Sequence, residues 1–258
     1  MEDNFKLVLS KLDRKDFVNV DFPDENELMF AKRMFTTEFD VYKNKLKWLG
    51  FYDFEKVLDA GCGYGQWLLT LSYLNKEVVG IDISKDRVNF VNAVLEEMGR
   101  KNAFVEQAST TTTMFPSNTF QGIFSYGVVF CTPWKKSLTE FYRLLTPGGL
   151  LYFNIASIDW YTFLWKTEHN QIGGYSPRSI VAQAFVNYVQ YQKAVNDFDG
   201  QVIMDPIETK SFLASLGFIN INIAKEGSLH NNSKNEKQSI WETNGERGIY
   251  EITAEKPR

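Results

Sequence analysis

Cysteine and histidine are scarce in this chain, with two of each among 258 residues. A disulfide framework needs paired cysteines at regular spacing, and a structural zinc site needs about four ligands, so neither is expected. Cys62 lies inside a glycine cluster and Cys131 follows an expected strand, which disfavours a bridge between them. Unbridged cysteines are typical of a reducing compartment, and we predict a cytoplasmic protein without a bound metal.

Long apolar runs and basic runs are also missing. No stretch approaches the length that spans a bilayer, and the first residues carry no signal-peptide pattern, so no membrane association is expected. The formal net charge is −4, and no run of Lys and Arg exceeds two residues. Nucleic-acid-binding proteins usually present a basic face, so this composition argues against such a partner.

Glycine, by contrast, is concentrated in one stretch. Lys56–Ala60 is a short apolar run typical of a buried strand, and Gly61, Gly63 and Gly65 follow it at once. Gln66–Leu74 then has the pattern of a helix. A strand that runs through a glycine turn into a helix brings backbone N–H groups close to a ligand, because a Cβ would hold that ligand away.

Two acidic residues flank this turn. Asp59 ends the first strand, and Asp82 follows a second apolar strand, Glu77–Ile81, in the region where doubly wound folds place an acid against a ribose diol. The glycines are spaced Gly-x-Gly-x-Gly, not Gly-x-Gly-x-x-Gly as in dinucleotide-binding folds. An acid two residues before the first glycine suits a ligand with a cationic amino group better than a pyrophosphate.

Three motifs together resemble the class I S-adenosylmethionine-dependent methyltransferases. They are Val57–Gly65 (VLDAGCGYG), Val79–Ser84 (VGIDIS) and Arg143–Gly149 (RLLTPGG). The resemblance covers roughly residues 35–256 and implies an α/β fold: a Rossmann-like, doubly wound, seven-stranded and mostly parallel sheet with an antiparallel terminal strand at its edge. It also implies S-adenosylmethionine as the cofactor and S-adenosylhomocysteine as the product.

The resemblance assigns roles to residues at the carboxyl ends of the strands. The backbone of Gly61, Cys62 and Gly63 would lie against the methionyl part of the cofactor, with Asp59 near its amino group. Asp82 would accept hydrogen bonds from the ribose hydroxyls, and Ile83 would cover one face of the adenine. The remaining positions implied by the resemblance are Ala108 and Ser109 near the adenine, and Ser125 and Tyr126 near the methionyl ammonium.

The chain also departs from the family pattern. Ala108-Ser109 stands where an Asp often binds the adenine amino group, so the adenine contact loses a charge. Phe120-Gln121 replaces a common Phe-Asp, and Cys131 stands where a His often follows the fourth strand. The glycine turn and the ribose acid are unaffected, so cofactor binding is still expected.

Further elements follow from periodicity and breakers. Helical spacing over Phe35–Leu49 predicts a helix that either covers the open side of the cofactor or packs on the sheet; the sequence favours neither. Ser84 and Asp205 are expected helix N-caps. The other expected helices are 135–145, 158–168 and 177–196, and the other expected strands are 103–107, 122–125, 150–155, 218–224 and 248–254, the last two forming a hairpin.

Aromatic residues gather in an insertion after the fifth strand, at residues 156–204. Doubly wound folds bind what they act on at this edge of the sheet, and aromatic side chains with polar tips suit an enclosed, mostly apolar pocket. The alternative is that these rings only pack the insertion against the rest of the chain. The candidate acceptor-binding residues are Trp160, Tyr161, Trp165, Tyr175, Tyr188 and Tyr191.

A general base is needed only if the acceptor is a hydroxyl or a protonated amine. His169, beside Glu168 in the insertion, is the candidate, although a merely exposed histidine is the simpler interpretation. His230 lies in a polar loop, and Cys131 is interpreted as a small packed residue rather than a nucleophile.

The sequence therefore predicts a methyltransferase that transfers a methyl group to O or N of a small-molecule acceptor by in-line displacement. A protein or RNA acceptor, a relative that binds the cofactor without transfer, and a dinucleotide oxidoreductase remain alternatives. We expect one domain, monomeric or homodimeric. Its parts are a helical cap (1–50), a cofactor-binding core (51–155), an aromatic acceptor lid (156–204) and a final helix with a hairpin (205–258).

Overall fold

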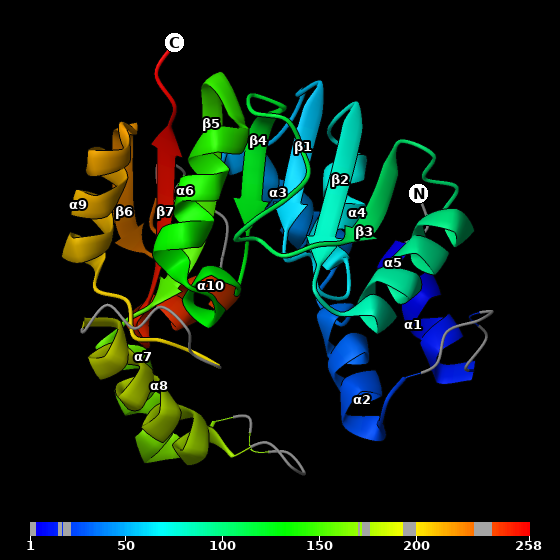
Figure 1. Ribbon diagram of the computed structural model, residues 1–258. Helices are drawn as coiled ribbons and strands as arrows, with labels where there is room; N and C mark the ends of the chain where they lie inside the picture. The colour runs from blue at the N-terminus through cyan, green and yellow to red at the C-terminus, as the bar shows by residue number, and fades with distance from the viewer. Residues whose placement is uncertain are drawn as a thin grey trace. The chain divides into compact units, whose positions relative to one another are not determined.

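The computed structural model describes residues 4–14, 17, 22–169, 171, 176–192, 200–229 and 239–258 (Figure 1). The chain divides into two compact units. Unit 1 consists of Met1–Ser109 and Phe120–Phe124, and unit 2 consists of Thr110–Thr119 and Ser125–Arg258.

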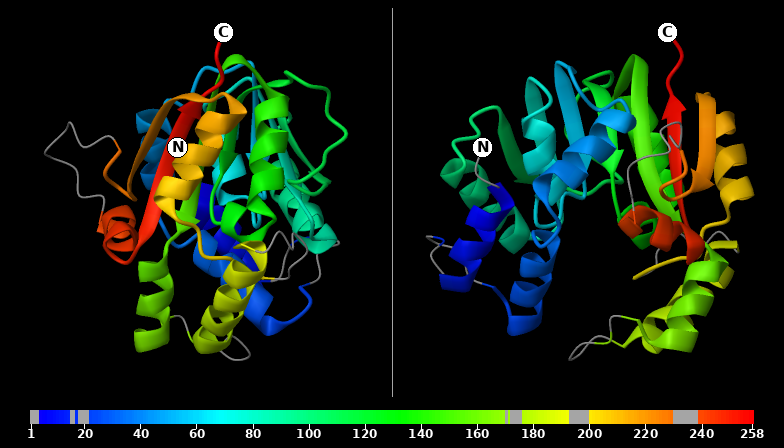
Figure 2. Two further views of the ribbon diagram at one scale, coloured as in Figure 1. Left: turned by 60° about the vertical axis from the view of Figure 1, so that its left-hand side comes forward. Right: turned by 180° about the vertical axis from the view of Figure 1, so that it is seen from behind.

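Unit 1 contains four parallel strands in the order β3-β2-β1-β4. The helix α5 packs on β2 and β3, while α4 packs on β1 and β2 and also contacts α3. From behind, α3 and α4 lie across these strands (Figure 2). The bounds are α1 Asn4–Arg14, α2 Glu25–Met34, α3 Phe39–Trp48, β1 Lys56–Ala60, α4 Gln66–Ser72, β2 Glu77–Asp82, α5 Lys85–Glu97, β3 Ala103–Gln107 and β4 Phe120–Ser125.

Unit 2 contains β5, β7 and β6 in that order, and β7 runs antiparallel to both neighbours. The helix α9 packs on β6 and against α6, and α7 packs along α8. The bounds are η1 Val129–Cys131, α6 Trp134–Leu144, β5 Leu145–Ala156, α7 Ile158–Thr167, α8 Pro177–Gln192, α9 Pro206–Leu216, β6 Ile219–Lys225, α10 Ser239–Glu246 and β7 Ile249–Glu255.

The full strand order, β3-β2-β1-β4-β5-β7-β6, confirms the predicted Rossmann-like sheet with an antiparallel terminal strand. Side-chain caps begin the helices as expected. The Ser84 hydroxyl accepts from the backbone N–H of Arg87, and the Asp205 carboxylate accepts from the N–H groups of Ile207 and Glu208. Local capping chemistry therefore sets where α5 and α9 begin.

The last two strands pair antiparallel as expected, but the prediction that no helix joins them is wrong, because α10 lies between β6 and β7 in the chain. The polar segment 231–238, which the sequence indicates as the turn, lies outside the described residues. In the structure, a Cβ on Gly245 would lie 2.4 Å from the Glu226 carbonyl oxygen. Glycine is therefore present for a close backbone contact within unit 2, and not because the chain turns there.

The last strand is also not at an edge of the sheet. β7 lies between β5 and β6, and Ile249, Ile252 and Ala254 are buried within it. The edge strand is β6, whose residues are mostly exposed or half-buried. The apolar content of β7 fits a strand that is covered on both sides.

The helix expected over Phe35–Leu49 is present but shorter, because α3 spans Phe39–Trp48. α2 ends at Met34 and α3 begins at Phe39. Between them the Thr36 hydroxyl donates to the Arg33 carbonyl at 2.8 Å, a local bond that competes with helix continuation. β5 is longer than expected and begins at Leu145, directly after α6.

No helix of the described residues is long and apolar enough to cross a membrane.

Candidate functional site

The glycine turn of unit 1 joins β1 to α4. The N–H groups of Gly61 and Cys62 both donate to the Ile81 carbonyl, at 2.8 and 2.9 Å, which ties the turn to the end of β2. Gly63 and Gly65 both adopt left-handed backbone conformations, with φ of +56° and +83°. A Cβ on Gly65 would meet Val91 Cγ1 at 2.6 Å, whereas a Cβ on Gly63 would meet nothing within 4 Å. Gly65 therefore serves packing, and Gly63 borders open space where a ligand can approach the backbone.

Asp82 stands at the end of β2, buried beside this turn. Its Oδ2 accepts from the Gly63 N–H at 3.0 Å, and its Oδ1 accepts from the Ser84 N–H at 2.9 Å. Each carboxylate oxygen has a further lone pair, so the group can still accept from two hydroxyls. Asp82 therefore holds the turn in shape and offers a bidentate acceptor suited to a diol.

Asp59, at the end of β1, is fully enclosed with 1% of its surface exposed. Within the described part of the chain, its Oδ2 has no hydrogen-bond partner. Burial raises the pKa of Asp59 well above its usual value, and the negative charge of Asp82 raises it further. A buried acceptor that lacks a partner is costly, so the site favours a cationic donor that would satisfy it. This fits the ammonium group of S-adenosylmethionine.

A second polar cluster of unit 1 joins the N-terminal helix α2 to the glycine turn. The Tyr64 hydroxyl donates to Glu27 Oε2, and the Arg87 guanidinium donates to both Glu27 oxygens at 3.1 and 3.2 Å. The Arg87 guanidinium also lies over the Tyr64 ring, 5.1 Å from its centroid. We call these three residues the Glu27 clamp. Burial and Glu27 together raise the pKa of Tyr64, so its hydroxyl stays protonated and continues to donate.

The sequence did not reveal this clamp. Tyr64 lies inside one motif and Arg87 follows another, but Glu27 precedes the turn by more than thirty residues and belongs to no motif. Phe22 and Phe30 add aromatic contacts to Tyr64, with ring centroids 6.1 and 5.8 Å apart. The tyrosine inside the motif Gly-Cys-Gly-Tyr-Gly was the available signal, since a buried hydroxyl requires a partner.

The residues assigned to the adenine lie at the ends of β2 and β3. Ile83 is 72% exposed, so its side chain is accessible to a ligand. Its carbonyl accepts from the Gln107 side-chain amide at 2.9 Å. Ala108 donates its N–H to the Asp82 carbonyl at 3.1 Å, and both Ala108 and Ser109 are half-buried. Their adenine roles stay predictions.

Ser125 and Tyr126 belong to unit 2. Ser125 is fully buried and Tyr126 half-buried, and next to them the Gly127 N–H donates to the Asn154 side-chain carbonyl at 2.7 Å. This bond fixes the backbone just after β4. Their role toward the methionyl end of the cofactor stays a prediction.

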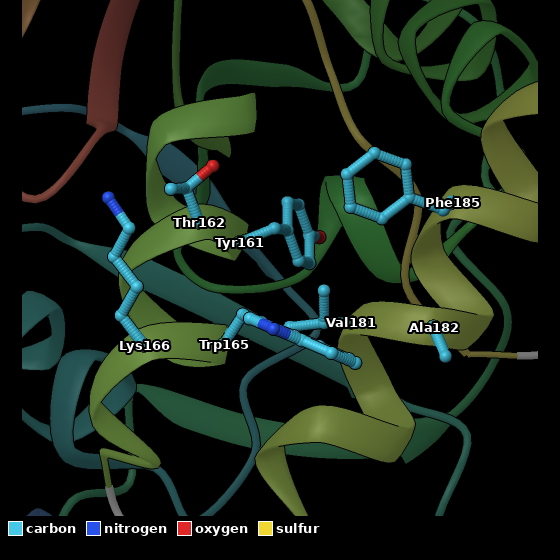
Figure 3. Close-up of a pocket in the computed structure, with 7 residues that line it drawn as sticks. All are labelled: Tyr161, Thr162, Trp165, Lys166, Val181, Ala182 and Phe185. Carbon is cyan, nitrogen blue, oxygen red and sulfur yellow. The ribbon is translucent and has the colours of Figure 1, made fainter.

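The predicted acceptor residues of unit 2 divide into separate groups. Tyr161 and Trp165 line a cavity between α7 and α8, together with Val181 and Phe185, which the sequence analysis did not select (Figure 3). Trp160 instead lies near Phe163, with ring centroids 5.7 Å apart.

Two predicted residues, Tyr188 and Tyr191, lie elsewhere. The Tyr191 ring lies 5.7 Å from the Trp134 ring, and its hydroxyl accepts from the Lys135 N–H at 3.1 Å. Tyr188 is half-buried on α8 and does not line the cavity, and Tyr175 lies outside the described residues. Exposed and buried positions alternate along α8, and the face on which a residue lies determines whether it lines the cavity. Aromatic content alone does not predict that face.

His169 lies at the end of α7, near α10. Its Nε2 is 3.5 Å from an Arg247 guanidinium nitrogen, and its ring centroid lies 5.3 Å from that of Phe163. The neighbouring Glu168 is paired with Arg178 at 2.7 Å, so Glu168 does not orient the imidazole alone. His169 is not among the residues that line the α7–α8 cavity.

Both cysteines are free thiols, with Cys62 buried in the glycine turn. Among the described residues, no group of three or more His, Cys, Asp or Glu side chains could hold a metal ion.

Comparison with known proteins shows that the sequence around the glycine turn is similar to that of methyltransferases. A sequence model of a methyltransferase domain matches residues 57–149. Phosphoethanolamine N-methyltransferase of Triticum aestivum is 39% identical over 99 residues, which cover 37% of this chain and 19% of that protein. Demethylmenaquinone methyltransferase of Lactococcus lactis subsp. lactis is 23% identical over 196 residues, covering 73% of this chain and 75% of that protein.

A solved structure extends the likeness to the whole fold. A SAM-dependent methyltransferase from Aquifex aeolicus superposes with a TM-score of 0.53 at 19% identity, covering 96% of this chain and 97% of that one. The fold likeness reaches beyond the matched domain, and the matched domain contains the turn, both acids and the Pro-Gly-Gly motif. Residues 57–149 of the chain therefore form a methyltransferase domain, and the chain as a whole has the fold of a SAM-dependent methyltransferase.

Proposed function

We propose that this enzyme transfers the methyl group of S-adenosylmethionine to an O or N atom of a small molecule. The observation that carries the cofactor assignment is the buried Asp59 oxygen without a hydrogen-bond partner. It is supported by the open space around Gly63 and by the Asp82 carboxylate, which can still accept from two hydroxyls. The small-molecule class is supported by the apolar cavity of unit 2 and by the names of the relatives, which refer to phosphoethanolamine and demethylmenaquinone.

The residues of unit 1 would bind and orient the cofactor. Asp82 accepts from the ribose hydroxyls, Asp59 balances the methionyl ammonium, and the bare backbone at Gly63 allows close approach. S-adenosylmethionine supplies a methyl group on a sulfonium, which is already activated for displacement. The protein's remaining task is to hold the acceptor in line and exclude water, which can supply much of the rate.

The direct test is product formation. The enzyme would be incubated with S-adenosylmethionine and separate pools of small metabolites, of protein and of RNA, and S-adenosylhomocysteine would be measured. Turnover with a small-molecule pool supports the proposal. Turnover confined to the protein or RNA pool would show that the acceptor is a protein or an RNA instead of a small molecule. Cofactor binding without turnover in any pool would indicate a relative that binds the cofactor but transfers no methyl group. Binding of NAD(P) in place of S-adenosylhomocysteine would indicate an oxidoreductase.

Cofactor binding should release protons from Asp59. Because the pKa of this carboxyl is raised in the free protein, it retains its proton above the pH where an exposed Asp has lost it. An ammonium placed beside it favours the ionised form and lowers the pKa, so up to about one proton leaves per ligand bound. Titration calorimetry with S-adenosylhomocysteine, repeated in buffers of different ionisation enthalpy, measures this release.

The Asp59 linkage has a definite sign and a matched control. In the free protein the folded state binds more protons than the unfolded state, so this group's contribution to stability falls as pH rises from about 4 through the folded pKa. Ligand affinity should fall as pH is lowered through the same range. Asp59→Asn should remove the proton release, and Asp86→Asn, on the exposed first turn of α5, should leave it intact. A heat that is identical in all buffers at every pH would contradict the role of Asp59.

His169→Ala should lower kcat and leave the affinity for S-adenosylhomocysteine unchanged if the imidazole acts as a general base. General-base catalysis contributes about 10²–10⁴-fold, so the loss should be of that order. His169→Gln keeps a polar group that can face Arg247 but cannot titrate near neutral pH. If Gln restores the rate, the histidine is structural; if the rate stays low and the acid limb of kcat against pH disappears, it is the base.

The cytoplasmic location and the monomeric or homodimeric state belong to this proposal as well. Cell fractionation and light scattering of the purified protein test them.

A further inference from the structure

Unit 2 contains a cavity of about 430 Å³ between α7 and α8. The Trp165 ring extends from α7 toward Val181 on α8, and the Phe185 ring extends from α8 toward Tyr161 (Figure 3). Thr162, Lys166 and Ala182 complete the lining. This volume lies in the range of small-molecule sites, and α7 begins two residues after β5 ends, at the edge where doubly wound folds bind what they act on.

The walls of this cavity offer little to a polar ligand. The Tyr161 hydroxyl already donates to the Val202 carbonyl at 3.2 Å, so Tyr161 lines the cavity with its ring and not with a free hydroxyl. The Trp165 carbonyl accepts from Arg178, whose guanidinium is also paired with Glu168. What remains is mostly the ring faces of Tyr161, Trp165 and Phe185 beside aliphatic groups, with the Thr162 hydroxyl and the Trp165 indole N–H as the few neutral polar groups. A hydrocarbon body matches such a lining, because a polar body would lose its hydration and gain few partners.

The apolar surface continues outside the cavity along the same two helices. Trp165 and Phe185 are 50% and 43% exposed, and the neighbouring Val186 and Val189 on α8 are 48% and 52% exposed. Large apolar side chains exposed together on a helix pair mark a binding surface more often than a solvated face. A chain longer than the cavity could therefore continue along α8 and remain in apolar contact.

One charge borders the cavity. Lys166 is the charged member of the lining, and within the described ranges it makes no ion pair. The nearby Arg178 is neutralised by Glu168. The rim is therefore positive, which favours a ligand whose head is neutral or anionic over one whose head is cationic.

We propose that the α7–α8 cavity binds the hydrocarbon chain of an amphiphilic methyl acceptor with a neutral or anionic head group. The inference rests on the proposed small-molecule methyltransferase and narrows its acceptor to molecules with an alkyl or prenyl chain. The chain anchors the acceptor, and the head group that carries the methylated atom lies outside the cavity.

The test is a chain-length series measured by titration calorimetry on the full chain without cofactor. Hexanoate, octanoate and decanoate are the probes, each below its micellar concentration, with octyltrimethylammonium as the cationic counterpart of octanoate. Each methylene that enters an apolar site contributes about 0.8 kcal/mol, so affinity should rise by roughly fourfold per methylene. Octanoate should bind more tightly than octyltrimethylammonium, and Lys166→Gln should weaken octanoate by about twofold at low salt.

Two variants with matched controls locate the binding. Ala182→Phe places a ring in the cavity from an exposed helix position, and Ala214→Phe makes the same change at an exposed position of α9, outside the lining. Phe185→Ala removes a wall, and Phe104→Ala makes the same change on β3 at a side chain that is equally exposed, at 43%. Decanoate affinity should fall at least tenfold in the first member of each pair and by less than twofold in the second, with thermal melting confirming that all four are folded.

Affinities that do not depend on chain length, or an equal effect of variant and control in both pairs, would overturn the proposal. Sedimentation with phosphatidylcholine vesicles without alkanoate binding would also overturn it, in favour of a membrane-facing surface. Because the series is measured without cofactor, its failure is distinct from failure of the methyltransferase assignment, which would appear as absent S-adenosylhomocysteine binding in a separate titration.

Discussion

Asp82→Ala is expected to lower the affinity for S-adenosylhomocysteine by at least a hundredfold. The variant removes the carboxylate that we propose accepts from two ribose hydroxyls, and hydrogen bonds to charged groups are worth about 1.5–3 kcal/mol each. It also leaves the N–H groups of Gly63 and Ser84 without their carboxylate, so the turn itself becomes less ordered. Titration calorimetry with the demethylated cofactor measures the loss.

The control for Asp82 is Asp86→Ala, which removes the same charge from an exposed position in the first turn of α5. It should leave affinity nearly unchanged, because an exposed charge outside the site is screened. Asp82→Asn keeps one acceptor oxygen and should fall between the wild type and the alanine variant. The alanine variant should remain folded with a small loss of stability, shown by circular dichroism during thermal melting. A folded Asp82→Ala protein with wild-type affinity would exclude the ribose role.

Substitutions of Gly63 and Gly65 should separate binding from folding. Gly65→Ala should destabilise the protein by ~2–4 kcal/mol, because its left-handed φ is costly for alanine and its Cβ would overlap Val91. Gly63→Ala should cost only ~1–2 kcal/mol, since the space around its Cβ is open. That same space is where the ligand would approach, so Gly63→Ala should lose most of its cofactor affinity. Urea unfolding and ligand titration measure the two effects.

The double variant Gly65→Ala, Val91→Ala checks the proposed cause. Removing the Val91 branches relieves the overlap, so the combined loss of stability should be smaller than the sum of the two single losses. Additive losses would show that Val91 is not what constrains Gly65. If Gly63→Ala bound the cofactor as the wild type does, the open space beside Gly63 would not be the cofactor site.

The core of unit 1 was largely readable from the sequence. β1 and β3 were predicted with their observed bounds, because each is a short apolar segment ended by a breaker or by a polar loop. Asp59 and Asp82 could be placed at strand ends for the same reason. Local chemistry, such as the Ser84 cap, determines these positions without help from distant residues.

The errors have a common physical origin in contacts that are distant in sequence. Nothing local distinguishes the Gly245 that permits α10 to approach Glu226 from a glycine in a turn. The position of β7 between β5 and β6 depends on pairing across the sheet. The acceptor residues were chosen for aromatic character, but the face that each presents on α7 or α8 decides whether it lines the cavity, and so Val181 and Phe185 were missed.

The Glu27 clamp limits how far the chain can be truncated from its N-terminal side. The family match begins at residue 57, yet the carboxylate that Tyr64 and Arg87 share comes from Glu27, thirty residues earlier. A fragment trimmed to the matched span would leave a tyrosine hydroxyl and a guanidinium without this carboxylate, beside the glycine turn. A fragment that keeps this ion pair and hydrogen bond must therefore begin before Glu27, ahead of the segment that the family model matches.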